Sequence, residues 1–574
     1  MNGLGSRSGR DGERRRRIWT NYSADGNIPP IDKKTDEPAS LMLLARHGRF
    51  WVAQPRDAGQ NPIKELDMCT TTRRDFLKAV GLGAAGLAAW RLRPAMAEGA
   101  SKAKPNVLLI IADDMCWRDC GCYGNKEVKT PNIDRLAADG MRFDAMFTAT
   151  AMCAPTRQQL YTGIFPVRNG AYPNHSRVYP GTKSVVHHLK ALGYRVGLIG
   201  KTHFGPRESF PFEFLPGGKG GASNTKAIAD FVNRDKGKPY CLIVCSNEPH
   251  SPWSKGESGA YPPGKLTVPP YLVDTAVTRR GLSKYYAEIT FLDGQVGGCM
   301  DVVEKSGRKA DTMFIFTSEQ GSSFPFGGKW TCYENGLKTA FVVRWPAGVK
   351  AGSATGAMAQ YVDVVPTLVE AAGGEPGKID TGRGGAPGGG RGFDGRSFLG
   401  VLLGKTDRHR DCVYGAHTTR GIINATQGGY PIRSVRSATH KYILNCNHEA
   451  TFTNAATRGA GATAIWGSWV ASAKTDKFAA DRVKWYQHRP AEELYDLAQD
   501  PYELKNIADD PACGKVKAEL KKRLLAWMAQ QGDKGNETEA GARRRQGRGD
   551  KAPKAGGKRK KKADRQPGKK AGSH

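Results

Sequence analysis

The sequence predicts an α/β protein with a large mixed, mostly parallel sheet between layers of helices, and a smaller C-terminal α+β domain. Short, continuous runs of β-branched residues and leucine carry this prediction, because strands buried on both faces of a parallel sheet have this composition. Segments with helix start and stop signals separate the runs. Four such runs lie at residues 106–112, 195–200, 240–245 and 312–317. Each ends in polar residues, and α/β proteins place their sites at the carboxyl ends of parallel strands.

The composition fits a globular protein, whereas the charge needs a separate explanation. The chain has 574 residues, enough for two or more domains, and 39% of them are apolar, enough for a large core. Its net charge of +32 at first suggests a polyanion-binding protein. Much of this charge lies in residues 533–574, which contain the run KRKKK at 558–562 and almost no apolar residues. We therefore predict a disordered basic tail, either merely solvated or bound to a polyanionic matrix or substrate, and we expect no nucleic-acid partner.

An export signal is predicted ahead of the first strand. Residues 71–89 combine a pair of arginines with an apolar run, and a small-residue motif follows that ends at Ala97. This pattern is typical of a twin-arginine signal peptide at residues 68–97, and it implies the twin-arginine export machinery as a partner and a periplasmic or extracellular location. We interpret residues 1–67 as an over-extended reading frame or a disordered extension before a true start at Met68. No stretch is long enough for a transmembrane helix.

The first strand run ends in two adjacent carboxylates, Asp113 and Asp114. Such a pair packs poorly and suits a hard divalent cation, although an ordinary turn at a strand end has the same composition. A helix is predicted next, at residues 130–140, because threonine and proline mark its start and glycine marks its end.

The most distinctive motif lies at residues 152–163, with the sequence MCAPTRQQLYTG. Cys153 is followed by a proline two positions on and by Arg157 four positions on. If Cys153 begins a helix, the free N–H groups there favour a bound anion, and Arg157, one turn further, can point back toward it. The alternative is a buried cysteine at the start of an ordinary helix.

The other strand runs also end in candidate site residues. Lys201 and His203 follow the second run and project to the same side, because they are two positions apart. The third run is followed by Pro249 and His250.

The fourth run leads into the sequence SEQG at residues 318–321, and Lys329 follows it. Glu319 and Gln320 therefore follow the fourth strand run, as Asp113 and Asp114 follow the first.

The order of these motifs resembles that of the type I sulfatases, which belong to the alkaline-phosphatase-like superfamily. In that family the cysteine of C-x-P-x-R is oxidised to Cα-formylglycine, the catalytic nucleophile. The resemblance therefore implies that a formylglycine-generating enzyme modifies Cys153. It also implies a metal site for Ca²⁺, with Mg²⁺ as the alternative. The ligands would be Asp113, Asp114, the modified Cys153, Glu319 and Gln320.

The resemblance assigns roles to the cationic residues and to the histidines. The cations that would offset charge on the sulfate oxygens are Arg157, Lys201 and Lys329. His203 would take the proton of the second formylglycine hydroxyl, and His250 would donate a proton to the leaving group. The family usually has Asp followed by Asn or His where this chain has Glu319 and Gln320, each one methylene longer. We therefore expect a retained site with a shifted ligand shell or an altered metal preference.

The resemblance implies a sulfated carbohydrate as the substrate. Residues 200–214, 268–271 and 322–326 look most like the sulfamidase (N-sulfoglucosamine sulfohydrolase) branch, in which the leaving atom is a glucosamine nitrogen of a heparan-type glycosaminoglycan. O-sulfated polysaccharides remain the alternative. Two other functions stay open: a phosphomonoester or phosphonate hydrolase of the same superfamily, and a catalytically dead polyanion-binding protein.

The C-terminal third is predicted to form a small sheet covered by a helix. A glycine-rich insertion at residues 373–395 precedes it. The strands are predicted at residues 433–436, 441–445 and 493–497, and the helix at residues 516–528. The resulting division is a catalytic domain at residues 98–405 and a C-terminal domain at residues 406–532.

Overall fold

The computed structural model describes residues 43–46, 49–52, 104–383, 391–418, 428–457 and 460–546. Residues 1–98 form one unit and residues 99–574 another, and each is described by itself. In the first unit, β1 (Leu43–Arg46) and β2 (Arg49–Val52) pair as an antiparallel hairpin within the extension predicted to be disordered. The predicted signal peptide at residues 68–97 lies outside the described residues.

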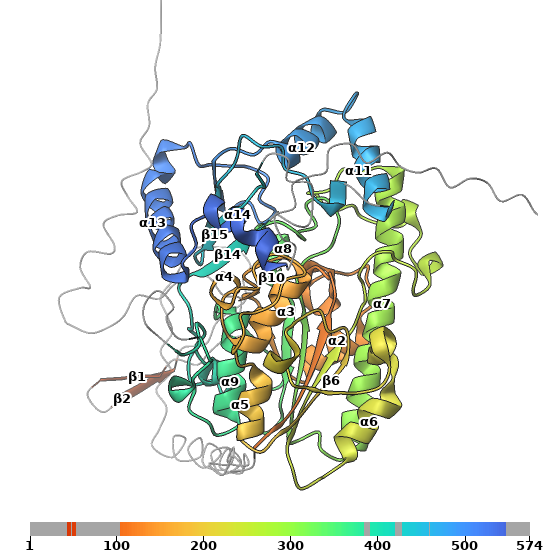
Figure 1. The fold of residues 1–574 in the computed structure, drawn as a ribbon, viewed down its shortest axis with the longest axis vertical. Helices are drawn as coiled ribbons and strands as arrows, with labels where there is room; N and C mark the ends of the chain where they lie inside the picture. Colours follow the sequence, from red (N-terminus) through yellow and green to blue (C-terminus); the bar gives the residue numbers. More distant parts are fainter. Residues whose placement is uncertain are drawn as a thin grey trace, which may run out of the picture. The chain divides into compact units, whose positions relative to one another are not determined.

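The second unit is built on an eight-stranded sheet with the order β12-β4-β11-β9-β3-β8-β6-β7 (Figure 1). The four predicted runs form its centre, as β3 (Asn106–Ala112), β6 (Arg195–Gly200), β8 (Tyr240–Cys245) and β9 (Thr312–Ser318), all parallel. The remaining strands are β4 (Met141–Phe143), β7 (Glu213–Phe214), β11 (Phe341–Arg344) and β12 (Ser353–Thr355). Because β11 runs antiparallel to β9 and β4, the sheet is mixed but mostly parallel, as predicted.

Helices cover both faces of this sheet (Figure 1). On one face, Leu108 and Ile110 of β3 share a core with Ile289 of α7 (Ala276–Lys305). On the other face, Leu109 of β3 shares a core with Leu160 of α3. The helices of the first face include α2 (Pro131–Ala138) and α6 (Thr225–Asn233), and those of the second are α3 (Cys153–Thr162), α5 (Val185–Ala191) and α9 (Val364–Ala371). Burial on both faces explains why the strand runs have no polar alternation.

A second, antiparallel sheet follows in the C-terminal part of the chain. Its strands pair in sequence order, as β14 (Val413–His417), β15 (Ile432–Arg436), β16 (His440–Asn445) and β17 (Glu492–Asp496). Leu520 and Leu524 of α13 (Gly514–Gln531) pack against Val435 and Tyr442 of this sheet. The helices α11 (Ala460–Ser472) and α12 (Lys477–Gln487) lie between β16 and β17 in the chain. The predicted fold class is therefore confirmed, and we propose that these elements form the C-terminal domain predicted for residues 406–532.

The prediction of a disordered tail is wrong for residues 536–545. Helix α14 (Asn536–Arg545) forms there, and Ala542 is buried against Val167 and Tyr172. Arg545 donates a hydrogen bond of 2.8 Å to the carbonyl of Gly170. Nothing in the sequence indicates this helix, because it is held by contacts with distant segments, among them Gly170 and, through Asn536, the carbonyl of Cys446. Residues 547–574, with the KRKKK run, lie outside the described part. Among the described helices, none is both long and apolar enough to cross a membrane.

Candidate active site

The candidate site residues meet at the carboxyl ends of the central strands. Asp113 and Asp114 follow β3, Lys201 follows β6, and Glu319 and Gln320 follow β9. They surround the floor of a cavity of about 1290 Å³. Of the predicted residues, those that line the cavity are Asp113, Cys153, Lys201, His203, His250 and Lys329. Segments that are distant in the sequence therefore meet at one edge of the sheet, because the carboxyl ends of the parallel strands share that edge.

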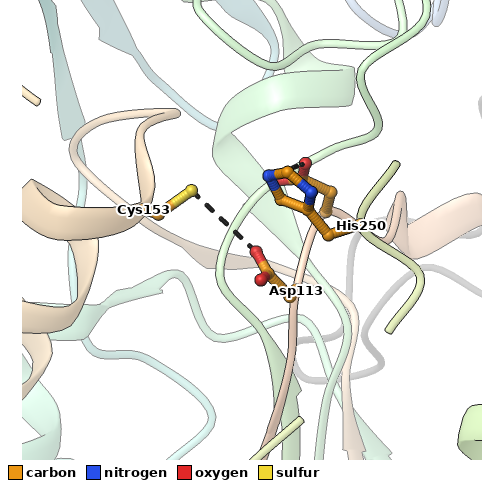
Figure 2. Close-up of side chains that lie close together, drawn as sticks. Asp113, Cys153 and His250 are labelled. Atoms are coloured by element: carbon orange, nitrogen blue, oxygen red, sulfur yellow. Dashed lines mark hydrogen bonds and ion pairs between the residues drawn. The ribbon is translucent and has the colours of Figure 1, made fainter. Parts of the chain in front are cut away.

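Cys153 is the first residue of α3 and is 3% exposed. Its Sγ lies 3.9 Å from Oδ1 of Asp113, and Figure 2 shows the two side chains facing each other with His250 beside them. The helix ends at Gly163, whose φ of 68° fits the left-handed region that glycine adopts without strain. Burial, reinforced by the charge of Glu319, raises the pKa of the Cys153 thiol to about 12. An unmodified thiol here is therefore protonated and weakly nucleophilic at neutral pH.

Cys153 belongs to a group of side chains that could hold a metal ion. Ligand atoms of Asp113, Asp114, Cys153 and His250 lie within 4.8 Å of one another. Nε2 of His250 is 3.5 Å from Oδ2 of Asp114, and the imidazole is 39% exposed toward the cavity. Carboxylates so close together repel one another unless a cation lies between or beside them.

The two residues that depart from the family pattern, Glu319 and Gln320, are fully buried within the same group. Nε2 of Gln320 donates to Oδ1 of Asp114 at 2.6 Å and to Oε2 of Glu319 at 3.2 Å, and it lies 3.5 Å from Sγ of Cys153. Among the described residues, Oε1 of Gln320 is buried without a hydrogen-bond partner. A buried amide oxygen without a partner beside three carboxylates is an available ligand for a hard cation. The donor set therefore fits the divalent metal that the resemblance implies.

Three cationic side chains, the buried Lys329 and Arg157 and the partly exposed Lys201, balance the three carboxylates. Lys201 forms an ion pair with Asp113 and lies 3.6 Å from Oε1 of Glu319. Lys329 lies 2.5 Å from Oδ2 of Asp114. Burial alone would lower the pKa of the Lys329 ammonium, but Asp114 more than offsets this and raises it above its usual value. Burial would likewise raise the pKa of Asp114, but Lys329, His250 and Lys201 hold it below its usual value.

Arg157 is the third cation next to the carboxylates, but it does not line the cavity. Its guanidinium is fully buried, forms an ion pair with Glu319 and donates a hydrogen bond of 3.3 Å to the carbonyl of Lys201. The resemblance implies that Arg157 offsets charge on the sulfate oxygens. In the structure its guanidinium contacts Glu319 and the Lys201 carbonyl.

One histidine at the site was not predicted. Nδ1 of His175 lies 2.8 Å from Nε2 of His203, and both side chains line the cavity. Burial, reinforced by Lys201, lowers the pKa of His203 to about 3, so this imidazole is neutral near pH 7. His175 follows no strand and belongs to no motif, so the sequence offered no signal for it. The adjacent Asn174 accepts the amide hydrogen of Ala154 at 3.3 Å and so fixes the start of α3.

Backbone strain also concentrates at this site. Asp114, His175, His203 and Trp330 have φ angles of 68°, 60°, 50° and 65°. Non-glycine residues in this left-handed region cost about 1–3 kcal/mol each and cluster at functional sites. The surrounding packing therefore holds these four residues in place against a local preference for other conformations.

Comparison of the sequence with known proteins identifies its family. The sequence model of the sulfatase family matches residues 105–226 and 220–374. The chain is 34% identical over 444 residues to an ulvan-active sulfatase of Formosa agariphila, which covers 75% of this chain and 81% of that protein. It is 26% identical over 480 residues to the human N-sulphoglucosamine sulphohydrolase, covering 75% of this chain and 91% of that protein.

Solved structures show the same fold. The structure of a protein in complex with its substrate D-glucosamine-2-N,6-O-disulfate has a TM-score of 0.60 and 20% identity, covering 76% of this chain and 100% of that one. The phosphonate monoester hydrolase of Agrobacterium radiobacter has a TM-score of 0.55 and 18% identity, covering 74% and 96%. These two likenesses describe the fold alone. Together with the 34% identical relative and the family match, they show that this chain is a sulfuric ester hydrolase of the sulfatase family, with the alkaline-phosphatase-like fold.

Proposed function

We propose that this enzyme removes sulfate from a sulfated carbohydrate by means of a Cα-formylglycine made from Cys153 and a hard divalent cation, Ca²⁺ or alternatively Mg²⁺. The position of Cys153 carries the proposal. It begins α3 at the floor of the cavity, with Sγ 3.9 Å from Asp113 and 3.5 Å from the Gln320 amide. When present, the cation would withdraw charge from a sulfate oxygen. The hydrated aldehyde would supply the attacking hydroxyl and a second hydroxyl, whose loss of a proton re-forms the carbonyl and breaks the carbon–oxygen bond to sulfate.

The chain's own residues would bind the sulfate and hold the ligands. Asp113, Asp114, Glu319 and Gln320 would hold the cation. Lys201 and Lys329 would offset negative charge on the sulfate oxygens, a contribution of about 3–4 kcal/mol for a preorganised donor. Burial tends to lower the pKa of both ammonium groups, but Asp113 and Asp114 raise it above its usual value, so both are charged at neutral pH. Arg157 would act indirectly, by positioning Glu319.

The two histidines would move protons. His203 is neutral near pH 7, because burial and Lys201 lower its pKa, and can therefore accept a proton. His250 is exposed to the cavity and would protonate the departing oxygen or nitrogen.

Replacing His250 by alanine should therefore act most on substrates with poor leaving groups. We expect kcat/KM for a sugar sulfate to fall about 100-fold or more, and that for an aryl sulfate to fall much less, because a phenolate leaves without a proton. The measurement is kcat/KM of both substrates for the wild type and His250→Ala. Equal losses on both substrates would assign His250 to metal or sulfate binding instead.

The length of the Glu319 side chain should set the strength of metal binding. Glu319→Asp withdraws the carboxylate by one methylene and disturbs the ion pair with Arg157, so we expect Ca²⁺ affinity to fall about tenfold or more. Calcium titration of chelator-treated protein by calorimetry measures this. Asp235→Glu, which alters an exposed carboxylate that does not line the cavity, is the control. Unchanged affinity in Glu319→Asp would remove Glu319 from the ligand set.

Two relatives guide the choice of substrate. The one with 34% identity is named for activity on ulvan, and the human one for activity on N-sulfoglucosamine. We propose a sulfated polysaccharide as the substrate class and glucosamine N-sulfate as the first candidate within it. The decisive experiment measures sulfate release from N-sulfated and O-sulfated glucosamine by Ca²⁺-loaded protein whose residue 153 is verified as formylglycine.

Each outcome of this experiment has a separate meaning. Release from the N-sulfate alone supports a sulfamidase, and release from the O-sulfate alone rejects that branch but keeps the mechanism. Aryl phosphate turnover exceeding aryl sulfate turnover would favour a phosphomonoester or phosphonate hydrolase. Salt-sensitive binding of sulfated glycan without any sulfate release would favour a dead polyanion-binding protein.

We further propose that the enzyme reaches the periplasm or the cell exterior through the twin-arginine machinery. That machinery carries folded proteins, whereas a formylglycine-generating enzyme acts on an unfolded chain. Conversion of Cys153 would therefore come first, in the cytoplasm. Retention of the enzyme inside cells in which Arg73 and Arg74 are replaced by lysine would support this route.

A further inference from the structure

A second cavity adjoins the catalytic one. It has a volume of about 430 Å³, within the size range of small-ligand sites. Thr202 lines both cavities, and it lies between the two candidate catalytic residues Lys201 and His203. We call this second cavity the side groove. Its lining residues are Arg177, Thr202, Phe204, Gly205, Pro206, Arg207 and Phe214.

The side groove has an aromatic wall. The rings of Phe204 and Phe214 are nearly parallel, at 22°, with centroids 6.5 Å apart. Phe214, in the edge strand β7, is 38% exposed and lines the groove. An exposed aromatic ring in a concave surface is typical of a ligand site, where it packs against an apolar face of the ligand. One face of a pyranose ring, which presents C–H groups, fits such a wall.

The side groove also carries two positive charges. Arg177 and Arg207 are both exposed, and the Arg207 guanidinium lies 5.3 Å from the centroid of the Phe214 ring. A Cβ built on Gly205 would lie 3.3 Å from Nε of Arg177, so this arginine lies across the glycine. Among the described residues that line the groove there is no carboxylate, and the neighbouring Glu213 is engaged by Arg234 at 2.7 Å.

Apart from the contact between Arg207 and the Phe214 ring, these charges are not neutralised within the described part of the chain. Neither Arg177 nor Arg207 forms an ion pair with another described residue. A guanidinium is a planar fork of donors that matches a carboxylate or a sulfate group. Two such forks beside an aromatic wall therefore select a ligand that is both a sugar and an anion.

We propose that the side groove is a second sugar subsite, which holds the neighbouring, negatively charged sugar of a polymeric substrate while the sulfated sugar occupies the catalytic cavity. This inference rests on the proposed function and specifies its substrate as an oligosaccharide or polysaccharide with anionic groups on adjacent sugars. The two arginines bind the carboxylate or sulfate group of the neighbouring sugar, and Phe214 packs against its ring. The enzyme consequently prefers chains over isolated sugars.

Kinetics with substrates of two lengths test the proposal. The probes are glucosamine N-sulfate and a heparin tetrasaccharide that carries glucosamine N-sulfate at its non-reducing end. For Arg207→Ala and Phe214→Ala we expect KM for the tetrasaccharide to rise about tenfold, with kcat and all constants for the monosaccharide unchanged, because the lost contacts touch only the neighbouring sugar. The controls are Arg280→Ala and Phe478→Ala, which change an exposed arginine and a 44% exposed phenylalanine outside both cavities.

Direct binding separates a failure of this inference from a failure of the proposed function. Calorimetry on the Cys153→Ala protein compares the same tetrasaccharide with uncharged, fully N-acetylated chitotetraose, with and without Arg207→Ala. We expect the charged tetrasaccharide to bind at least tenfold more tightly, and Arg207→Ala to weaken its binding about tenfold while leaving that of the N-acetylated chitotetraose unchanged. If no substrate is hydrolysed but this pattern appears, the subsite stands and the proposed activity is wrong. If the variants match their controls in binding and in KM, or if both substrates weaken equally, the side groove is not a subsite.

Discussion

Replacing Cys153 by alanine should abolish sulfate release. We expect kcat to fall about 10⁴-fold or more, because the variant lacks both the attacking hydroxyl and the second hydroxyl that permits release of the bound sulfate. The measurement is sulfate release from the substrate that the wild type hydrolyses, together with mass spectrometry of the peptide that contains residue 153.

A matched variant separates chemistry from packing. Cys241 is a buried cysteine in β8, 1% exposed, and it lies among the apolar residues behind the site. Cys241→Ala leaves a small void in the core, so its free energy of unfolding should fall, but its kcat should stay unchanged. Full activity in Cys153→Ala, or equal losses in the two variants, would contradict the proposed nucleophile.

Replacing Arg157 by methionine should destabilise the fold as well as the site. The guanidinium and the Glu319 carboxylate are both fully buried. Removing the arginine leaves Glu319 with Lys201, 3.6 Å away, as its remaining cation, so we expect the free energy of unfolding to fall by about 3–5 kcal/mol. Urea denaturation measures this change, and metal titration should show weaker binding because Glu319 is no longer held.

Two further variants identify the cause of that loss. Adding Glu319→Gln to Arg157→Met removes the unpaired charge, so the double variant should be more stable than the single one. Arg234→Met breaks the exposed ion pair with Glu213 and should change stability by less than about 1 kcal/mol. If Arg157→Met is no less stable than Arg234→Met, the buried pair does not stabilise the fold as argued.

The central strands could be predicted from the sequence because burial on both faces leaves a clear pattern. The first run coincides with β3, and the fourth differs from β9 by one residue. The edge strands β7 and β12 could not be predicted, because elements of two and three residues show no periodicity. The reversed direction of β11 was equally invisible, since the apolar run of a central strand does not encode its direction.

The site was predictable to the extent that it follows the strands. Asp113, Lys201 and Glu319 come together because parallel strands end at one edge. What the sequence could not supply were contacts made by side chains from unrelated segments. Arg157 lies beneath Glu319 rather than beside the substrate cavity, and His175 reaches His203 from a loop without any motif.

The complete burial of α3 has a consequence for the life history of each molecule. All ten of its residues are buried, and the Cys153 thiol sits inside that shell. Cys153 lines the cavity but is only 3% exposed, so under the proposed mechanism the modifying enzyme would act on this thiol while the chain is still open. Each molecule would then be committed once, when it folds: chains converted before folding would be active, and chains that fold first would stay inactive until they unfold. The specific activity of a preparation would therefore depend on the relative rates of folding and oxidation.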